Sequence, residues 1–115
     1  QTCALPIYPS KELNDKIEKT AKELDIQIHI EDITSTDSFY MDDVNKFFQR
    51  MPENFKPAAA EMESYALFYL ARKYNKQAAC ILTISDIIGT NVETSPEERE
   101  KGLRKSIELA LEVLK

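Results

Sequence analysis

Several residue types are scarce in this sequence, and each shortage excludes a kind of site. The 115 residues include two cysteines, two glycines, one histidine and no tryptophan. Two cysteines cannot form a disulfide framework, and neither has the CxxC or CxxH spacing of a zinc motif. Cys80 lies within an apolar run, so we expect a small buried side chain. Gly89 and Gly102 do not make a glycine-rich loop of the kind that binds phosphate.

Long apolar runs and an excess of positive charge are also missing. No run approaches the roughly 20 residues needed to cross a bilayer, and no secretory signal is visible. The formal net charge is −5 and the basic residues are scattered, which argues against a nucleic-acid partner or an anionic membrane surface. We therefore expect a soluble, cytoplasmic protein with no nucleic-acid or membrane partner.

The length and the hydrophobic periodicity indicate one α/β domain. A chain of 115 residues has room for one hydrophobic core. Helical spacing predicts four helices: after Ser10, weakly over 42–51, over 62–74 and after Ser95. Strand spacing predicts strands over 26–33 and 78–85, with a third candidate at 57–61. This alternation is typical of a mostly parallel or mixed sheet flanked by helices.

The apolar patterns also predict how these elements pack. Residues 62–74 are apolar on nearly every side, which predicts a helix packed on more than one face. Residues 78–85 form a continuous apolar run, typical of a central strand covered on both faces. Ser95, Pro96 and Glu98 supply the N-cap, first-turn proline and capping-box glutamate of the last helix. We expect its core-facing stripe to be Leu103, Ile107, Ala110, Leu111 and Leu114.

Acidic residues stand next to two apolar runs of the sequence. Glu61 and Glu63 stand in AAAEMESYA, residues 58–66, and are either surface residues at an element boundary or part of a site. Asp86 follows the expected central strand, where open α/β sheets face their ligands, and could serve as a general acid or merely end the strand in a turn. Arg99 lies in the first turn of the last helix, where the helix dipole disfavours a cation. It therefore needs a partner, and Asp86 is a candidate.

Three motifs, in their order and separations, resemble the C-terminal half of the bacterial, hexameric-type purine nucleoside phosphorylases. They are EMES at 61–64, ILTISD at 81–86 and TSPEER at 94–99. STDSFY, residues 35–40, also resembles a stretch of that family. The resemblance covers residues 8–115, which it identifies as the C-terminal half of a single nucleoside phosphorylase domain with a partial α/β fold.

The resemblance implies a role for each matching residue. Glu63 would accept hydrogen bonds from the ribose hydroxyls, because a carboxylate has two acceptor oxygens and a vicinal diol has two donors. Met62 would pack against the sugar, and Phe39 would stack on the purine. Glu61 would also help to bind the sugar.

The acid chemistry implied by the resemblance lies at the end of the predicted central strand. Asp86 would donate a proton to purine N7 as the glycosidic bond breaks. Arg99 is too basic to deliver a proton, so it would move in to position Asp86. Ser85 would support Asp86 and Arg99 without itself contacting the substrate.

The implied activity is reversible phosphorolysis of purine nucleosides, with phosphate as co-substrate and no metal or organic cofactor. Alternatives are a nucleosidase, a uridine phosphorylase-like member of the superfamily, or a non-catalytic nucleoside-binding module.

The phosphate site and the first strands of this family lie in the N-terminal half, so we expect the 115 residues alone to be inactive. The resemblance further implies a homo-oligomeric parent, a hexamer. Residues 1–7 match no periodicity and look like a sequencing-adapter scar.

Overall fold

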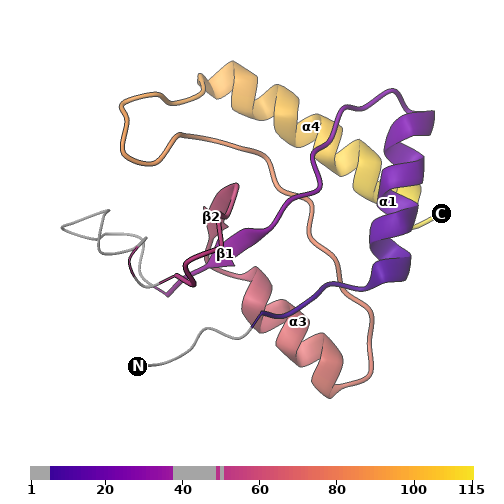
Figure 1. Cartoon of the computed structure of the whole chain (residues 1–115). Helices are drawn as coiled ribbons and strands as arrows, with labels where there is room; N and C mark the ends of the chain where they lie inside the picture. The colour runs from indigo at the N-terminus through magenta and orange to yellow at the C-terminus, as the bar shows by residue number, and fades with distance from the viewer. Residues whose placement is uncertain (1–5, 38–48, 50) are drawn as a thin grey trace.

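Figure 1 shows the chain as a computed structural model, which describes residues 6–37, 49 and 51–115. In chain order the elements are helix α1 (Lys11–Glu23), strands β1 (Ile33–Ser35) and β2 (Ala59–Glu61), and helices α3 (Ser64–Lys73) and α4 (Pro96–Val113). Helices and a parallel strand pair make this a partial α/β fold, as the sequence predicts. The expected helix over 42–51 lies almost entirely outside the described residues, and so does Phe39.

The two strands form a short parallel sheet. Ile33 pairs with Ala59 and Ser35 pairs with Glu61, and the backbone N–H of Thr36 extends the ladder by donating to the Glu61 carbonyl at 2.9 Å. The candidate strand at 57–61 is therefore confirmed. This pairing places Ser35, the first residue of STDSFY, beside Glu61 of EMES, and Figure 1 shows β1 and β2 next to each other.

Two of the predicted strands, 26–33 and 78–85, are wrong, because the described residues do not form regular strands over most of these ranges. Residues 26–32 and 78–85 have no strand assignment, and β1 takes up only the last residue of the expected 26–33 strand. The reason is that a strand needs ladder partners on a neighbouring strand, and the described residues supply none along most of these segments. The predicted coverage of 78–85 on both faces also fails, because Leu82 and Ile84 are exposed.

Local capping fixes the helix ends that the sequence predicts. The Ser10 hydroxyl accepts a hydrogen bond from the backbone N–H of Leu13 at the start of α1. Ser95 and Glu98 form a complete capping box at the start of α4, with Pro96 in the first turn. Asp25 adopts a left-handed conformation with a φ of 54° just after α1, and this lets the chain turn back into 26–32.

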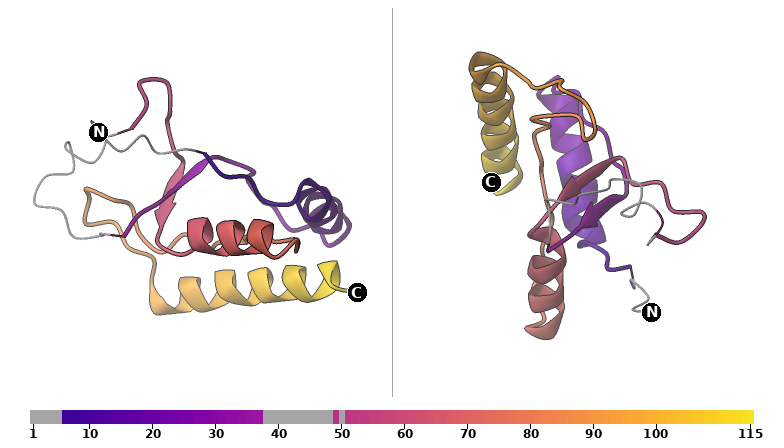
Figure 2. Two further views of the ribbon diagram at one scale, coloured as in Figure 1. Left: turned by 90° about the horizontal axis from the view of Figure 1, so that it is seen from below. Right: turned by 90° about the vertical axis from the view of Figure 1, so that its left-hand side faces the viewer.

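The core lies between α1 and α4. Ala21, Leu109 and Val113 are buried there, and aliphatic side chains from the two extended segments pack against them. Figure 2 shows the two helices side by side in its right-hand view, while α3 extends away from α4. The core-facing residues of α4 are therefore Leu109 and Val113.

The predicted core-facing stripe of α4 is wrong. Four of its five residues, Leu103, Ile107, Leu111 and Leu114, are at least half exposed. The helix is apolar on two faces, so periodicity alone could not determine which face packs against α1. The prediction for 62–74 fails similarly: α3 buries only Ser64 and Phe68, and its other apolar side chains are exposed.

Within the described residues no helix is both long and apolar enough to cross a membrane.

Candidate functional site

The carboxylate of Glu61 is the centre of a hydrogen-bond network where β2 meets α3. Its Oε2 accepts hydrogen bonds from the backbone N–H groups of Glu63 at 2.8 Å and Ser64 at 2.6 Å. Its Oε1 accepts the Ser64 hydroxyl at 2.6 Å. Free N–H groups at the start of a helix need acceptors, so Glu61 caps α3 from the end of the strand.

Strand β1 joins the same network through Ser35. The Ser35 side chain lowers the pKa of the Glu61 carboxylate, and its oxygen accepts the backbone N–H of Tyr65 at 3.4 Å. Burial raises the pKa of Glu61, but the hydrogen bonds from Ser64 and Glu63, together with the Ser35 side chain, outweigh it and hold the pKa below its usual range. The network therefore favours the ionised carboxylate.

Glu63 is the exposed carboxylate of the motif. It is the N-cap residue of α3 and its own side chain does not cap that helix. The Glu63 carboxylate accepts the backbone N–H of Met62 at 3.2 Å, while Met62 itself is 40% exposed. Both predicted sugar-binding side chains are thus accessible to a ligand at the end of β2.

Cys80 shows that the segment leading to Asp86 passes close to these glutamates. Its thiol is half-buried, and burial together with the nearby charges of Glu61 and Glu63 raises the pKa of Cys80. The expected small buried side chain is confirmed in part, and the thiol is held in its protonated form. The segment 78–85 therefore runs past the EMES motif before it reaches Asp86.

Asp86 is held in a short loop directly after that segment. The Ser85 hydroxyl donates to Asp86 Oδ1 at 2.6 Å, and Asp86 forms an isolated antiparallel bridge with Glu93. The loop turns at Gly89, whose φ of 79° suits the third position of a type II turn. Ser85 thus contacts the Asp86 carboxylate through Oδ1, and Oδ2 accepts no hydrogen bond from any described residue. The supporting role of Ser85 stays a prediction.

Arg99 lies one turn into α4, where its backbone N–H donates to the Ser95 carbonyl at 2.9 Å. Its side chain is exposed. Among the ion pairs of the described residues none joins Arg99 to Asp86. The expected approach of Arg99 to Asp86 stays a prediction, as do the ligand contacts of the other site residues.

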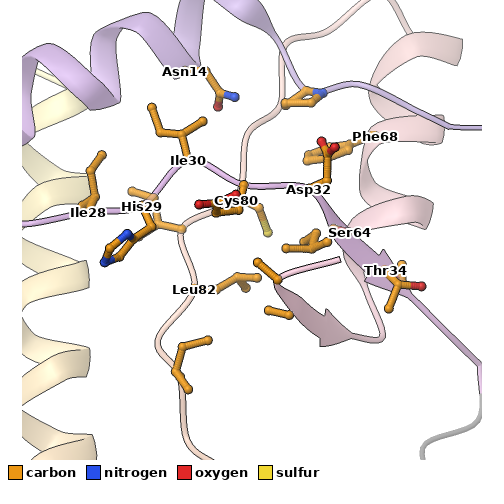
Figure 3. A pocket seen from close by; sticks show the side chains of 18 of the residues that line it. Asn14, Ile28, His29, Ile30, Asp32, Thr34, Ser64, Phe68, Cys80 and Leu82 are labelled. Carbon is orange, nitrogen blue, oxygen red and sulfur yellow. The ribbon is translucent and has the colours of Figure 1, made fainter. Parts of the chain in front are cut away.

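A large open cleft of 1390 Å³ runs beside this site. Ser64, Phe68 and Cys80 line it, as Figure 3 shows, and so does Met62, but Glu63, Asp86 and Arg99 do not. Its lining combines apolar side chains, such as Ile28, Ile81 and Phe68, with polar ones, such as His29, Asp32 and Lys105. These residues come from the two extended segments and from the helices and strands around them.

The described side chains include no group of three or more His, Cys, Asp or Glu residues placed to hold a metal ion.

Sequence reasoning overlooked Ser35 and Ser64 as partners of Glu61. Ser64 is the last residue of EMES, and a serine three residues after a glutamate is within reach of a helix-capping carboxylate. That local signal was available for Ser64. Ser35 lies 30 residues before Tyr65, and only the pairing of β1 with β2 could reveal it.

Comparison with known proteins places the chain in a family. A family model described as the Phosphorylase superfamily matches residues 3–115. The chain is 41% identical over 93 residues to a protein of Thermoanaerobacter sp. (strain X514) named purine nucleoside phosphorylase DeoD-type, covering 81% of this chain and 39% of that protein. A Streptococcus suis (strain 05ZYH33) protein of the same name is 36% identical over 113 residues, which cover 96% of this chain and 46% of that protein. The chain thus spans less than half the length of these relatives.

Proposed function

We propose, because this chain belongs to the phosphorylase superfamily, that the complete protein is a purine nucleoside phosphorylase. It would convert a purine nucleoside and phosphate into the free base and a pentose 1-phosphate. The observation that carries the proposal is the match to proteins named purine nucleoside phosphorylase over 81–96% of the chain. The accessible carboxylates of Glu63 and Asp86 support it.

The chain would supply the nucleoside side of the active site. Glu63 accepts hydrogen bonds from the ribose diol, with Met62 against the sugar and Phe39 on the purine. As the bond between C1′ and the purine nitrogen breaks, its electron pair moves onto the base and Asp86 donates a proton to N7. A phosphate oxygen forms the new bond to C1′. Arg99 positions Asp86 during this step.

Phosphate would bind mainly to the part of the fold that this chain does not cover. Phosphate sites are built from backbone N–H groups, glycines or arginines, and this sequence has two glycines. The complete protein would need phosphate as co-substrate and no metal or organic cofactor. We further propose a cytoplasmic homo-oligomer, a hexamer by its resemblance to that family, and no activity for the 115 residues alone.

A chimera tests the function. The 93 aligned residues of the Thermoanaerobacter relative are replaced by the corresponding residues of this chain, and release of hypoxanthine from inosine is measured with and without phosphate. We expect phosphate-dependent release. Asp86→Asn should lower kcat by about 10²–10⁴-fold, the usual contribution of a general acid.

The matched control is Asp25→Asn, because asparagine also tolerates the left-handed conformation after α1. This variant should keep full activity. Release that is equally fast without phosphate would contradict the phosphorylase proposal and favour the nucleosidase. An inactive but folded chimera would contradict both.

A further inference from the structure

We propose that Glu61 is a positioning residue that holds Glu63 in place for the ribose diol, and that Glu61 does not itself bind the sugar. The inference rests on the proposed function, since it takes Glu63 as the ribose-binding carboxylate. It replaces the direct contact with the sugar that the sequence predicts for Glu61.

The first step is that both oxygens of Glu61 are already engaged. Oε2 accepts two backbone N–H groups and Oε1 accepts the Ser64 hydroxyl, at distances of 2.6–2.8 Å. Ser35 lies opposite Glu61 in the strand register and also lowers the pKa of its carboxylate. A ribose hydroxyl could reach this carboxylate only by displacing one of these donors, which would leave a group at the start of α3 without its partner.

The second step is that two of these bonds act on the backbone of Glu63. The Glu63 N–H and the following Ser64 N–H both donate to Glu61 Oε2, so one oxygen holds the peptide groups on either side of the Glu63 Cα atom. This fixes where the Glu63 side chain leaves the backbone. The Glu63 carboxylate itself accepts only the neighbouring Met62 N–H among the described residues, so it remains available to a diol.

The third step is that the network fixes Glu63 relative to the rest of the fold. Ser35 pairs with Glu61 in the strand register and also accepts the Tyr65 N–H. Ser35 of β1 and the first turn of α3 therefore both lie at the Glu61 position. Glu63 sits between β2 and α3, and losing the Glu61 carboxylate would remove the two hydrogen bonds that hold the peptide groups on either side of it.

Backbone amide exchange, measured by NMR on the whole chain, tests the contact. Glu61→Gln keeps the shape of the side chain but replaces one acceptor oxygen by a donor. We expect exchange of the Glu63 and Ser64 amides to become about 10-fold faster, as loss of a hydrogen bond to a carboxylate implies. Glu108→Gln, at an exposed position on α4, is the control and should change neither amide.

Calorimetry tests the function of the contact, with inosine and 2′,3′-dideoxyinosine as probes. The ratio of their dissociation constants reports the diol alone, and the wild-type chain should prefer inosine by about 10-fold or more. Glu63→Gln should bring the ratio close to one, and Glu61→Gln should lower it by at least about 3-fold. The double variant should match Glu63→Gln, because the two residues act as one unit.

The outcomes separate this proposal from the proposed function. If the wild-type chain does not prefer inosine, the ribose role of Glu63 fails, and the positioning role of Glu61 fails with it. If the preference is present but Glu61→Gln weakens both ligands equally, Glu61 is only structural and the positioning proposal alone is overturned. Unchanged amide exchange in Glu61→Gln would overturn it as well.

Discussion

The hydroxyl of Ser85 donates a 2.6 Å hydrogen bond to Oδ1 of Asp86. The bond joins the end of the extended segment 78–85 to the first residue of the loop, and Asp86 Oδ2 accepts no hydrogen bond from any described residue. A carboxylate held by one oxygen can present the other to a purine in a fixed direction. The orientation of the proposed general acid is therefore set by its neighbour in sequence.

Removing that hydroxyl should slow the reaction without weakening binding. In the chimera we expect Ser85→Ala to lower kcat by about 10-fold, since one hydrogen bond to a carboxylate is lost, and to leave the KM for inosine unchanged. Steady-state kinetics at saturating phosphate measures both constants. Thr90→Ala removes a hydroxyl from the same loop without touching Asp86 and serves as the control. Equal kcat values for wild type and Ser85→Ala would refute the orienting role.

Helix α4 should not tolerate a methyl group at Gly102. A Cβ atom there would lie 2.8 Å from the Thr83 Cγ2, and Thr83 is a stiff, branched side chain that also shares a hydrogen bond with Ser106. We expect Gly102→Ala to destabilise the chain by about 1–3 kcal/mol. Lys101→Ala, next to it but exposed, should stay within about 0.5 kcal/mol of wild type. Urea unfolding measures both, and a stabilised Gly102→Ala would show that α4 does not pack on Thr83.

The stability of the chain should fall at acidic pH because of Glu61. Its pKa is lower in the folded chain than its usual value, so the ionised carboxylate contributes stability above the unfolded pKa, and that contribution is lost as the pH falls through the folded pKa. Glu98, whose pKa the Ser95 hydrogen bonds also lower, acts in the same direction.

Urea unfolding of wild type and Glu61→Gln at neutral and acidic pH isolates the Glu61 contribution. The variant should be less stable at pH 7, and the difference should narrow as Glu61 becomes protonated. A difference that stays constant from neutral to acidic pH would mean that the Glu61 carboxylate charge contributes nothing.

The exposed stripe of α4 should make the isolated chain self-associate. Leu103, Ile107, Leu111 and Leu114 form a contiguous apolar face at least half exposed to water, and such faces drive association. The double variant Ile107→Gln, Leu111→Gln should reduce the sedimentation coefficient toward that of a monomer. A wild-type chain that is monomeric at every concentration would contradict this.

Short-range signals account for the parts of the fold that the sequence predicts well. The N-caps at Ser10 and Ser95 and the proline after Ser95 act within one helical turn, so they are readable without knowing the fold. The short strand at 59–61 was predicted only as a candidate. The predicted core-facing stripe of the last helix was wrong because Leu103 and Leu109 lie on two different apolar faces. Choosing between these faces requires knowing where α1 packs.

The parts of the fold and of the site that the sequence did not predict depend on contacts between residues far apart in the chain. Residues 26–32 and 78–85 have the side-chain pattern of strands, but a ladder depends on neighbours that the described residues do not supply. In the candidate site, Glu63 and Asp86 stood out by their positions next to apolar runs, and the family resemblance added Ser85. The role of Glu61 depends on Ser35 in another strand, and no local pattern contains that relation.

An NMR titration of the isotope-labelled chain with inosine tests the central claim most directly. The claim is that these residues form the nucleoside side of a phosphorylase active site. We predict saturable shifts of the backbone amides of Met62, Glu63, Ser64 and Asp86, with little change at Ala21 in the core. A folded chain in which inosine does not shift the Glu63 and Asp86 amides would contradict it.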